Sequence, residues 1–267
     1  MNELELATLK RQYWSDGFVV LKSPFTKEEV NTWKCEASRL WALPGLLDDL
    51  NLRTEYRRDV SGTFVLDRLD PVLDVSKIFL QLILDKRLGF ALKAILGGPA
   101  VPLKCKLIRK DPLVNGYLPH QDFRYWQWLN IPPDHLCSVA ISFNRSTPES
   151  GGIEIFPGLH HRLLASPPDR PDDDFDFSKI DATRGIVPCL DPGDMLVFHS
   201  LAPHKSGPNT SDAPRTILLP SYATGAHARL YTRYQMYEAE RRGRHLVGFE
   251  RYNVVLSSME EAIAWSL

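Results

Sequence analysis

The chain has 267 residues, enough to bury one large hydrophobic core without the help of disulfides. Its 32 basic and 33 acidic side chains nearly cancel and are scattered, which argues against the basic stripe of a nucleic-acid-binding face. The first residues are polar, no run approaches the roughly 18 apolar residues of a membrane helix, and the four cysteines form no C-x-x-C pair. We therefore expect a cytoplasmic protein without nucleic-acid or membrane partners, and its oligomeric state stays open.

Helical patterns dominate the first hundred residues. Apolar residues recur at spacings of three and four, and residues that favour helix caps precede or follow these runs. The predicted elements, in chain order, are a helix that carries Leu6, Leu9 and Tyr13 and ends at Gly17, a strand at 18–21, a helix capped by Thr26 and Glu29, a strand at 62–69, and helices at 76–84 and 86–96.

From residue 100 the pattern changes to short β-rich runs that are separated by Pro, Gly and Asn turns. Regularly spaced short strands are typical of an antiparallel jelly roll. We expect a mainly β protein with flanking helices, built on a cupin-like double-stranded β-helix. The predicted single domain has a helical layer at about 1–99, a core at about 100–225 and a C-terminal extension at 226–267. The predicted core strands are 101–110, 138–144, 152–158, 194–199 and 216–223.

Two segments fit neither layer. Residues 166–181 are rich in proline and aspartate and too polar for a core, so we expect a surface loop. Whether this loop is a solvated insertion or the lid of an active site stays open. In the C-terminal extension, residues 231–245 are expected to be partly helical, and 257–265 to form a capped terminal helix.

Four polar residues indicate the chemistry. His120 and Asp122 are two positions apart, a spacing that puts both side chains on one face of a β-strand. With a distant histidine they would give two imidazoles and one carboxylate, the set that binds Fe(II) and leaves positions open for other ligands. Arg215 follows His204 by eleven residues, inside an apolar run. A buried guanidinium requires an anion, either a bound dicarboxylate or an acidic side chain in a structural ion pair.

The distant histidine has to be chosen among several candidates. His199 and His204 both lie near the predicted strand 194–199, but only His204 has an arginine eleven residues later. His160 and His161 follow a Pro-Gly turn and are expected to be structural or to face a substrate. His204 is therefore the predicted third metal ligand.

Four segments in order resemble the phytanoyl-CoA dioxygenase family, a branch of the Fe(II)- and 2-oxoglutarate-dependent oxygenases. The resemblance spans about residues 5–222 and includes an HxDxxxW motif like that of the ectoine hydroxylases. The segments are YWSDGFVVLKSPFTKEEVNTW, PHQDFRYW, SGGIEIFPGLHH and GDMLVFHSLAPHKSGPNTSDAPR.

The resemblance implies a role for each matching residue. His120, Asp122 and His204 match the iron ligands. Arg215, Ser206 and Tyr117 match residues around 2-oxoglutarate, and either Lys104 or Lys106 is a further candidate between which the sequence does not choose. Trp126 matches a tryptophan of the substrate pocket, and its neighbours Arg124 and Tyr125 are substrate-binding candidates that suit a polar, anionic or zwitterionic molecule.

The implied reaction uses Fe(II), 2-oxoglutarate and O2 and hydroxylates an unactivated C–H bond of a small polar metabolite, with release of succinate and CO2. An amino acid, a betaine, a phosphonate or a natural-product intermediate would fit. Because the carboxylate of Asp122 is present, halogenation is not expected. Desaturation, epimerisation, cyclisation and acyl-CoA hydroxylation stay open, as do a metal hydrolase or isomerase and a non-catalytic jelly-roll protein that binds a metal or ligand.

Overall fold

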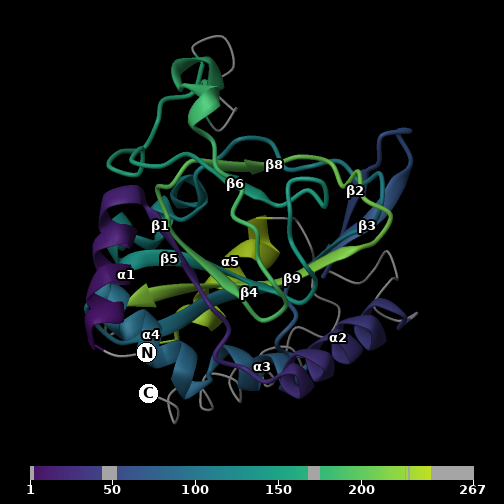
Figure 1. Ribbon diagram of the computed structural model, residues 1–267, viewed down its shortest axis with the longest axis horizontal. Helices are drawn as coiled ribbons and strands as arrows, with labels where there is room; N and C mark the ends of the chain where they lie inside the picture. The colour runs from purple at the N-terminus through teal and green to yellow at the C-terminus, as the bar shows by residue number, and fades with distance from the viewer. Residues whose placement is uncertain (1–2, 44–52, 168–174, 226, 228, 242–267) are drawn as a thin grey trace.

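Two antiparallel sheets form the centre of the computed structural model, which describes residues 3–43, 53–167, 175–225, 227 and 229–241 (Figure 1). The larger sheet has the strand order β1-β7-β5-β9-β4-β3-β2, and the smaller one pairs β6 with β8. Buried side chains from both sheets, among them Ile155 and Phe198, pack in one cluster between them. The strands are β1 (Phe18–Leu21), β2 (Thr54–Arg58), β3 (Phe64–Leu69), β4 (Ala100–Lys110), β5 (Leu136–Ser142), β6 (Ile153–Ile155), β7 (Met195–His199), β8 (His204–Ser206) and β9 (Arg215–Thr224).

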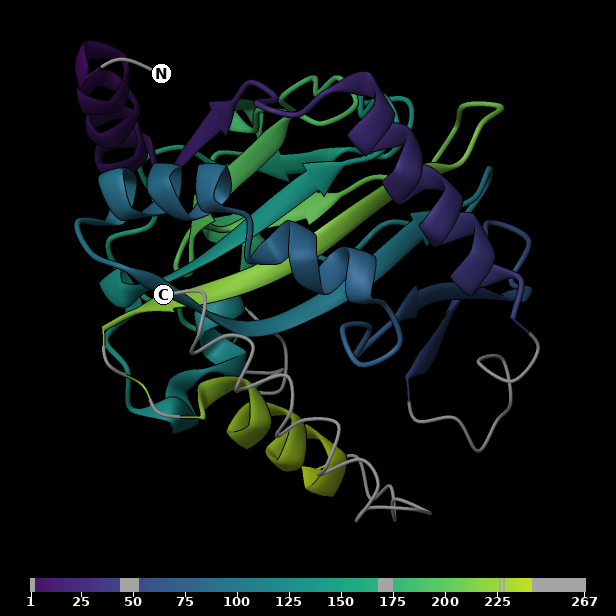
Figure 2. The same ribbon diagram turned by 90° about the horizontal axis from the view of Figure 1, so that it is seen from below.

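Helices cover the outer face of the larger sheet, as Figure 2 shows. The capping box that begins the second helix is present, because Thr26 Oγ1 accepts from the N–H of Glu29 while the Glu29 carboxylate accepts from the N–H of Thr26. Gly97 ends the fourth helix with a φ of 82°, a left-handed conformation that favours glycine. The helices on this face are α1 (Glu3–Asp16), α2 (Lys27–Trp41), α3 (Lys77–Ile83) and α4 (Lys86–Leu96). Helix α5 (Leu230–Arg241) lies apart from them and contacts β4, with its Tyr234 near Lys104.

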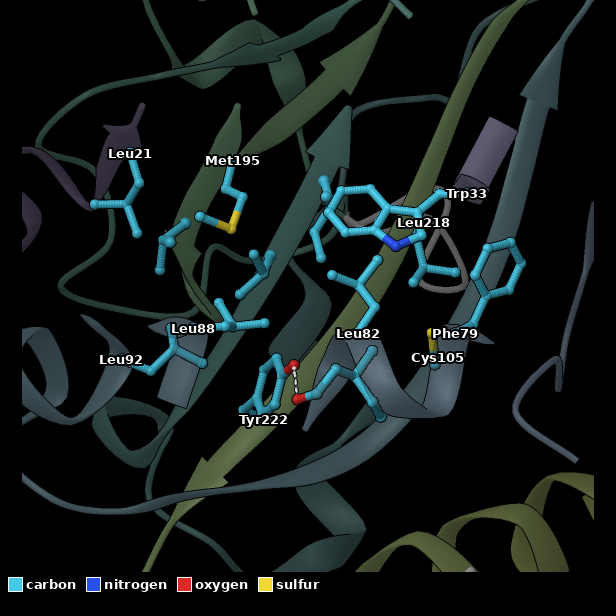
Figure 3. Close-up of a cluster of buried hydrophobic side chains, with 14 of the residues drawn as sticks. Leu21, Trp33, Phe79, Leu82, Leu88, Leu92, Cys105, Met195, Leu218 and Tyr222 are labelled. Atoms are coloured by element: carbon cyan, nitrogen blue, oxygen red, sulfur yellow. Dashed lines mark hydrogen bonds between the residues drawn. The ribbon is translucent and has the colours of Figure 1, made fainter. Parts of the chain in front are cut away.

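The main hydrophobic core lies between these helices and the larger sheet (Figure 3). Phe79 of α3 and Leu88 of α4 are fully buried against the sheet. The hydroxyl of Tyr222 on β9 donates to the carbonyl of Ile83 at 2.9 Å, which ties the sheet to α3. Burial of the apolar helix faces therefore fixes the helical layer on one side of the sheet and leaves the other side for polar side chains.

Alternation along β4 separates the two faces of the larger sheet. Cys105 and Leu107 belong to the core beneath the helices. Since successive side chains of a strand point to opposite faces, Lys104, Lys106 and Lys110 point towards the smaller sheet. Three cationic side chains are thus directed into the space between the two sheets.

The expected jelly-roll architecture and its flanking helices are confirmed. The strands expected at 18–21 and 62–69 are found as β1 and β3, and together with β2 they join the larger sheet, so the N-terminal segment contributes strands as well as the helical layer. Strands β2 and β8 were not predicted, since each is short and carries no apolar run. Helix α5 lies in the segment that was expected to be partly helical, whereas 257–265 lie outside the described residues. No helix in the described part of the chain is both long and apolar enough to cross a membrane.

The core predicts a clear contrast between two phenylalanines of the helical layer. Phe79 is fully buried, whereas Phe90 of α4 is 57% exposed. We expect Phe79→Ala to lower the free energy of unfolding by about 3–5 kcal/mol, because it removes buried area and leaves a cavity. The control Phe90→Ala should change it by no more than about 0.5 kcal/mol. Urea denaturation measures both, and equal effects would contradict this packing.

Candidate metal centre

An antiparallel bridge brings His120 beside His204, the first residue of β8. The N–H of His120 donates to the carbonyl of His204 at 2.9 Å, and the N–H of His204 donates back at 3.0 Å. Residues directly opposite in such a pair project from the same face, and the two imidazole rings lie 4.1 Å apart between centroids. The backbone pairing at the edge of the smaller sheet therefore sets the geometry of both rings.

Asp122 reaches the histidines by a route that differs from the expected one. The sequence predicts a strand through His120 and Asp122, but only His120 is extended, and Asp122 begins a 3₁₀ helix, Asp122–Tyr125. The chain turns at this point, which brings Oδ1 of Asp122 to 4.0 Å from Nε2 of His120. The pairing of the two residues is thus found, whereas the strand parity that predicted it is wrong.

Backbone carbonyls fix the tautomer of both histidines. Nδ1 of His120 lies 2.8 Å from the carbonyl oxygen of Leu118, and Nδ1 of His204 lies 3.0 Å from that of Ala202. Because a carbonyl only accepts, each Nδ1 must carry the proton and donate it. Each Nε2 then carries the lone pair that binds a metal.

Burial and charge set the protonation of the site. Burial, with a further contribution from the neighbouring His204, lowers the pKa of His120 to about 3. Burial alone would raise the pKa of Asp122, but the charges of His204 and Lys104 hold it below its usual value. At neutral pH His120 is therefore a neutral imidazole and Asp122 an ionised carboxylate, the forms in which both bind a metal.

Two serines hold the carboxylate in place. Ser138 of β5 donates from Oγ to Oδ2 of Asp122 at 2.5 Å, and its oxygen lies 3.1 Å from Oγ of Ser221 on β9. The register pairs Ser138 with Ser221 and Ser221 with Lys104 of β4. These side chains form a row across three strands, and Oδ1 of Asp122 is left facing the histidines. The sequence analysis missed both serines. Each alternates with apolar neighbours along its strand, and this pattern could have revealed that they share a face.

The other candidate histidines lie elsewhere. His199 of β7 accepts the N–H of Leu201 at Nδ1 and places Nε2 3.2 Å from the Asp134 carboxylate. His160 packs against that ring, with centroids 5.2 Å apart, and its Nε2 faces the carbonyl of Trp14. Both histidines therefore serve the packing of α1, and the choice of His204 over His199 agrees with the geometry.

Arg215 is buried without an acidic partner in the described part of the chain. Its exposed fraction is 2%, one amino group donates to the carbonyl of Gly151 at 2.9 Å, and Nε and the other amino nitrogen have no partner there. Burial lowers the pKa of Arg215 to about 10, so it remains charged at neutral pH. The structural ion pair considered from sequence is not found among these residues, and an anionic ligand is the remaining explanation.

Lys110 is a site residue that the sequence analysis missed. It pairs with Arg215 across β4 and β9, is fully buried, and donates to Oγ of Ser206 at 2.9 Å. Burial and the charge of Arg215 lower its pKa to about 6, so at neutral pH it is largely the neutral amine until an anion binds beside it. The signal was its position, since Lys110 alternates in phase with Lys104 and Lys106 along the predicted strand.

Ser206 and Tyr117 lie beside these two cations. The Ser206 hydroxyl also accepts the N–H of Tyr117 at 3.0 Å. The phenol of Tyr117 makes a short hydrogen bond to Asp67, and the Arg57 guanidinium lies 3.8 Å from the centre of its ring. Burial and Asp67 raise the pKa of Tyr117 to about 12, so it stays neutral. The structure thus brings Ser206, Tyr117 and Arg215 together, as expected.

The three expected substrate-binding residues have different surroundings. Trp126 is fully buried, with Nζ of Lys104 5.1 Å from the centre of its ring. Tyr125 is 48% exposed, and its ring lies 6.2 Å from that of His120. Arg124 donates to the carbonyl of Leu164 at 2.7 Å and so anchors a loop. Tyr125 lies beside a histidine of the centre, Trp126 lies beside Lys104, and Arg124 is engaged with the backbone.

The donor set fits Fe(II). Ligand atoms of His120, Asp122 and His204 all lie within 4.8 Å of one another, and the described residues contain no other cluster of three such side chains. Two imidazoles and one carboxylate leave coordination positions open, as oxygenases with non-haem iron require. A closed structural site would be expected to have a fourth protein ligand. The buried guanidinium of Arg215, with Lys110 beside it, is suited to binding an anionic group near this centre.

Comparison with known proteins agrees with this geometry. The family described as Phytanoyl-CoA dioxygenase (PhyH) matches residues 13–217. The methylphosphonate hydroxylase of Gimesia maris is 32% identical over 219 residues, which cover 82% of this chain and 80% of that protein. The ectoine dioxygenase of Sphingopyxis alaskensis is 26% identical over 220 residues, or 75% of this chain and 70% of that protein.

Solved structures share the fold. The epimerase SnoN, crystallised with Fe3+, alpha ketoglutarate and nogalamycin RO, has a TM-score of 0.67 at 19% identity and covers 84% of this chain and 85% of its own. EctD from S. alaskensis with bound Fe also has a TM-score of 0.67, at 20% identity, and covers 84% of this chain and 77% of its own. With the family match over residues 13–217, the expected resemblance is confirmed. The chain therefore belongs to the phytanoyl-CoA dioxygenase family and is an oxygenase.

Proposed function

We propose that the protein is an Fe(II)- and 2-oxoglutarate-dependent dioxygenase that hydroxylates an unactivated C–H bond of a small polar metabolite and releases succinate and CO2. One observation carries the proposal. A site with two histidines and one carboxylate lies in the same inter-sheet space as the buried Arg215, which has no acidic partner among the described residues, and the neighbouring Lys110. This combination suits a metal together with a dicarboxylate co-substrate. A metal hydrolase activates only water and would not need the buried Arg215.

Each residue has a defined task in this proposal. His120, Asp122 and His204 hold the iron. When bound, the iron with 2-oxoglutarate and O2 supplies the oxidising power that breaks the C–H bond. The guanidinium of Arg215, whose Nε and Nη1 have no protein partner among the described residues, grips the distal carboxylate of 2-oxoglutarate. The bound anion would raise the pKa of Lys110 again, so that Lys110 adds a second positive charge.

The neighbouring residues orient and shield the co-substrate. Ser206 holds Nζ of Lys110 in place and, with a small shift, offers its hydroxyl to the same carboxylate. Tyr117, held by its bonds to Ser206 and Asp67, forms a wall beside it. Since Arg215 and Lys110 are almost completely buried, the carboxylate would be bound without competition from water, which strengthens its electrostatic attraction.

The proposed substrate is small and polar. The relatives named above, a methylphosphonate hydroxylase and an ectoine dioxygenase, are named for small polar compounds, which supports this class. Tyr125, whose ring lies beside that of His120, and Trp126, whose ring lies beside Lys104, are the proposed substrate contacts. Arg124 is a weaker candidate for substrate binding, because its guanidinium already donates a hydrogen bond to the carbonyl of Leu164. Hydroxylation is favoured over halogenation because Asp122 supplies the carboxylate ligand.

We also propose a cytoplasmic location. All four cysteines are free, and Cys35 and Cys189 are exposed. Exposed free thiols persist most readily in a reducing compartment.

Asp122 offers the most direct test of the metal centre. Asp122→Ala should lower the affinity for Fe(II) by at least about 100-fold, more than is usual for loss of an outer-shell partner, and should abolish succinate release. The visible charge-transfer band of the anaerobic complex with Fe(II) and 2-oxoglutarate measures binding. The exposed Asp212 provides the control Asp212→Ala, which should behave like the wild type. Full turnover by Asp122→Ala would rule out the proposed centre.

Arg215 tests the co-substrate site. Arg215→Ala should raise the KM for 2-oxoglutarate by at least about 30-fold, the equivalent of about 2 kcal/mol for one side of a buried charge pair. Arg215→Lys keeps the charge but loses the two-pronged geometry of the guanidinium, so its KM for 2-oxoglutarate should lie between those of the wild type and Arg215→Ala. Arg145→Ala, at an exposed position, is the control. Succinate release at varied 2-oxoglutarate measures KM, and an unchanged value in Arg215→Ala would contradict the assignment.

The serine that supports Asp122 gives a third prediction. Ser138→Ala removes the hydrogen bond to Oδ2 of Asp122 and should weaken Fe(II) binding by about 10- to 100-fold. The matched control is Ser142→Ala, because Ser142 lies four residues further on β5 and its hydroxyl donates to the carbonyl of Asn144 instead. Iron titration followed by the charge-transfer band separates them, and equal affinities in the two variants would refute a role for Ser138.

A further inference from the structure

A second pair of lysines lies along β4, away from Lys110, with Lys104 buried and Lys106 half-buried. Lys104 and Lys106 point into the same space between the sheets because all three lysines alternate in phase. The register places Lys104 opposite Ser221, whose hydroxyl contacts Ser138, the serine that bonds to Asp122. Lys104 therefore belongs to the row of side chains that supports a metal ligand.

Neither lysine has a compensating partner within the described residues. Lys104 is 6% exposed, and neither it nor Lys106 makes a hydrogen bond or ion pair there. Nζ of Lys104 lies instead over aromatic rings, 5.1 Å from the centre of Trp126 and 5.6 Å from that of Tyr234 on α5. Nε1 of Trp126 is also buried and has no partner in this part of the chain. Unpaired buried donors of this kind indicate a place for an anion.

The surrounding charge is positive. Burial, followed by the charges of Lys104 and Arg68, lowers the pKa of Lys106 to about 7. Asp122 and Asp70 act in the opposite direction, but the charge of Asp122 is needed by the metal. An incoming anion would relieve the repulsion among the cations and would keep Lys106 protonated.

A single molecule of 2-oxoglutarate cannot contact both Lys104 and the Arg215 site. Lys104 and Lys110 are six residues apart on β4, about 20 Å at the usual rise of a strand. A five-carbon dicarboxylate that binds Arg215 and Lys110 is too short to reach Lys104. Lys104, at the far end of the row, is therefore available to another ligand while 2-oxoglutarate is bound, and Lys106 lies next to it on the same face.

We infer that Lys104 and Lys106 bind an acidic group of the substrate, a phosphonate or a carboxylate, and hold the adjoining carbon near the metal. The inference rests on the proposed function in placing the reacting carbon at the iron. Trp126 supplies an apolar wall for the carbon skeleton and a further donor at Nε1. The acidic group thus anchors the substrate on one side of the centre, while 2-oxoglutarate is anchored on the other.

The test is a binding measurement with defined probes. Methylphosphonate, acetate and neutral acetamide are titrated by calorimetry into the anaerobic protein that carries Fe(II) and 2-oxoglutarate. The proteins are the wild type, Lys104→Met, Lys106→Met and the exposed control Lys77→Met. Methionine keeps most of the buried stem and removes the charge, and the charge-transfer band in each sample reports whether the metal site is intact.

We expect the wild type and Lys77→Met to bind an anionic probe and to discriminate against acetamide. Lys104→Met and Lys106→Met should each weaken anion binding by about tenfold or more, as for loss of a charged hydrogen bond. Tighter binding of methylphosphonate or of acetate identifies which acid the site prefers. The inference is overturned if the wild type binds neither anion, if acetamide binds as tightly as they do, or if both variants with an intact band bind anions like the wild type.

Succinate release separates the two proposals. Anion binding that depends on both lysines, in a wild-type protein that releases no succinate with any substrate, would refute the oxygenase reaction and leave the anion site standing. Succinate release that is stimulated by neutral compounds alone would refute the anion site and leave the oxygenase standing.

Discussion

The register of β4 against β9 is the constraint on which the site depends. It places Lys110 opposite Arg215 and Lys104 opposite Ser221, all facing the smaller sheet. A slip of one residue would turn these side chains into the hydrophobic core under the helices and expose Leu107 and its neighbours to the site. Packing of the helical layer against one face therefore fixes which polar groups occupy the other.

The metal centre is assembled from three separate backbone features. A bridge joins the segments of His120 and His204, and a 3₁₀ turn directs Asp122 towards them. The hydroxyl of Ser138, on the larger sheet, donates to Oδ2 of Asp122. Carbonyl groups that hold Nδ1 orient the rings before any metal binds. Because tautomer, charge and position are set in advance, little rearrangement is needed on binding.

Uncompensated positive charge connects the fold with function. The charge of Arg215 lies at one end of the inter-sheet space and that of Lys104 at the other, each buried where water screens poorly. Such charges are costly in the free protein and attract anions strongly. The protein retains these charges where they oppose folding and favour binding, an arrangement typical of a functional site.

Periodicity and motif order in the sequence were sufficient to predict the main helices, the core strands, the jelly roll and the four residues His120, Asp122, His204 and Arg215. These features rest on local spacing and on residue types whose burial demands a partner. The parity argument for Asp122 was wrong although its conclusion agrees with the structure, because a 3₁₀ turn with no clear local signal replaced the expected strand.

Only the tertiary structure decided which lysines share a pocket and with what. The sequence does not distinguish Lys104, Lys106 and Lys110. Pairing with β9 puts Lys110 beside Arg215, and it puts Lys104 beside Ser221, whose hydroxyl contacts the serine that holds Asp122. Ser138 and Ser221 gained their role in the same way, from strands far apart along the chain. The sequence determines which faces are polar, but cross-strand register and sheet packing determine which polar groups meet, since those contacts are non-local.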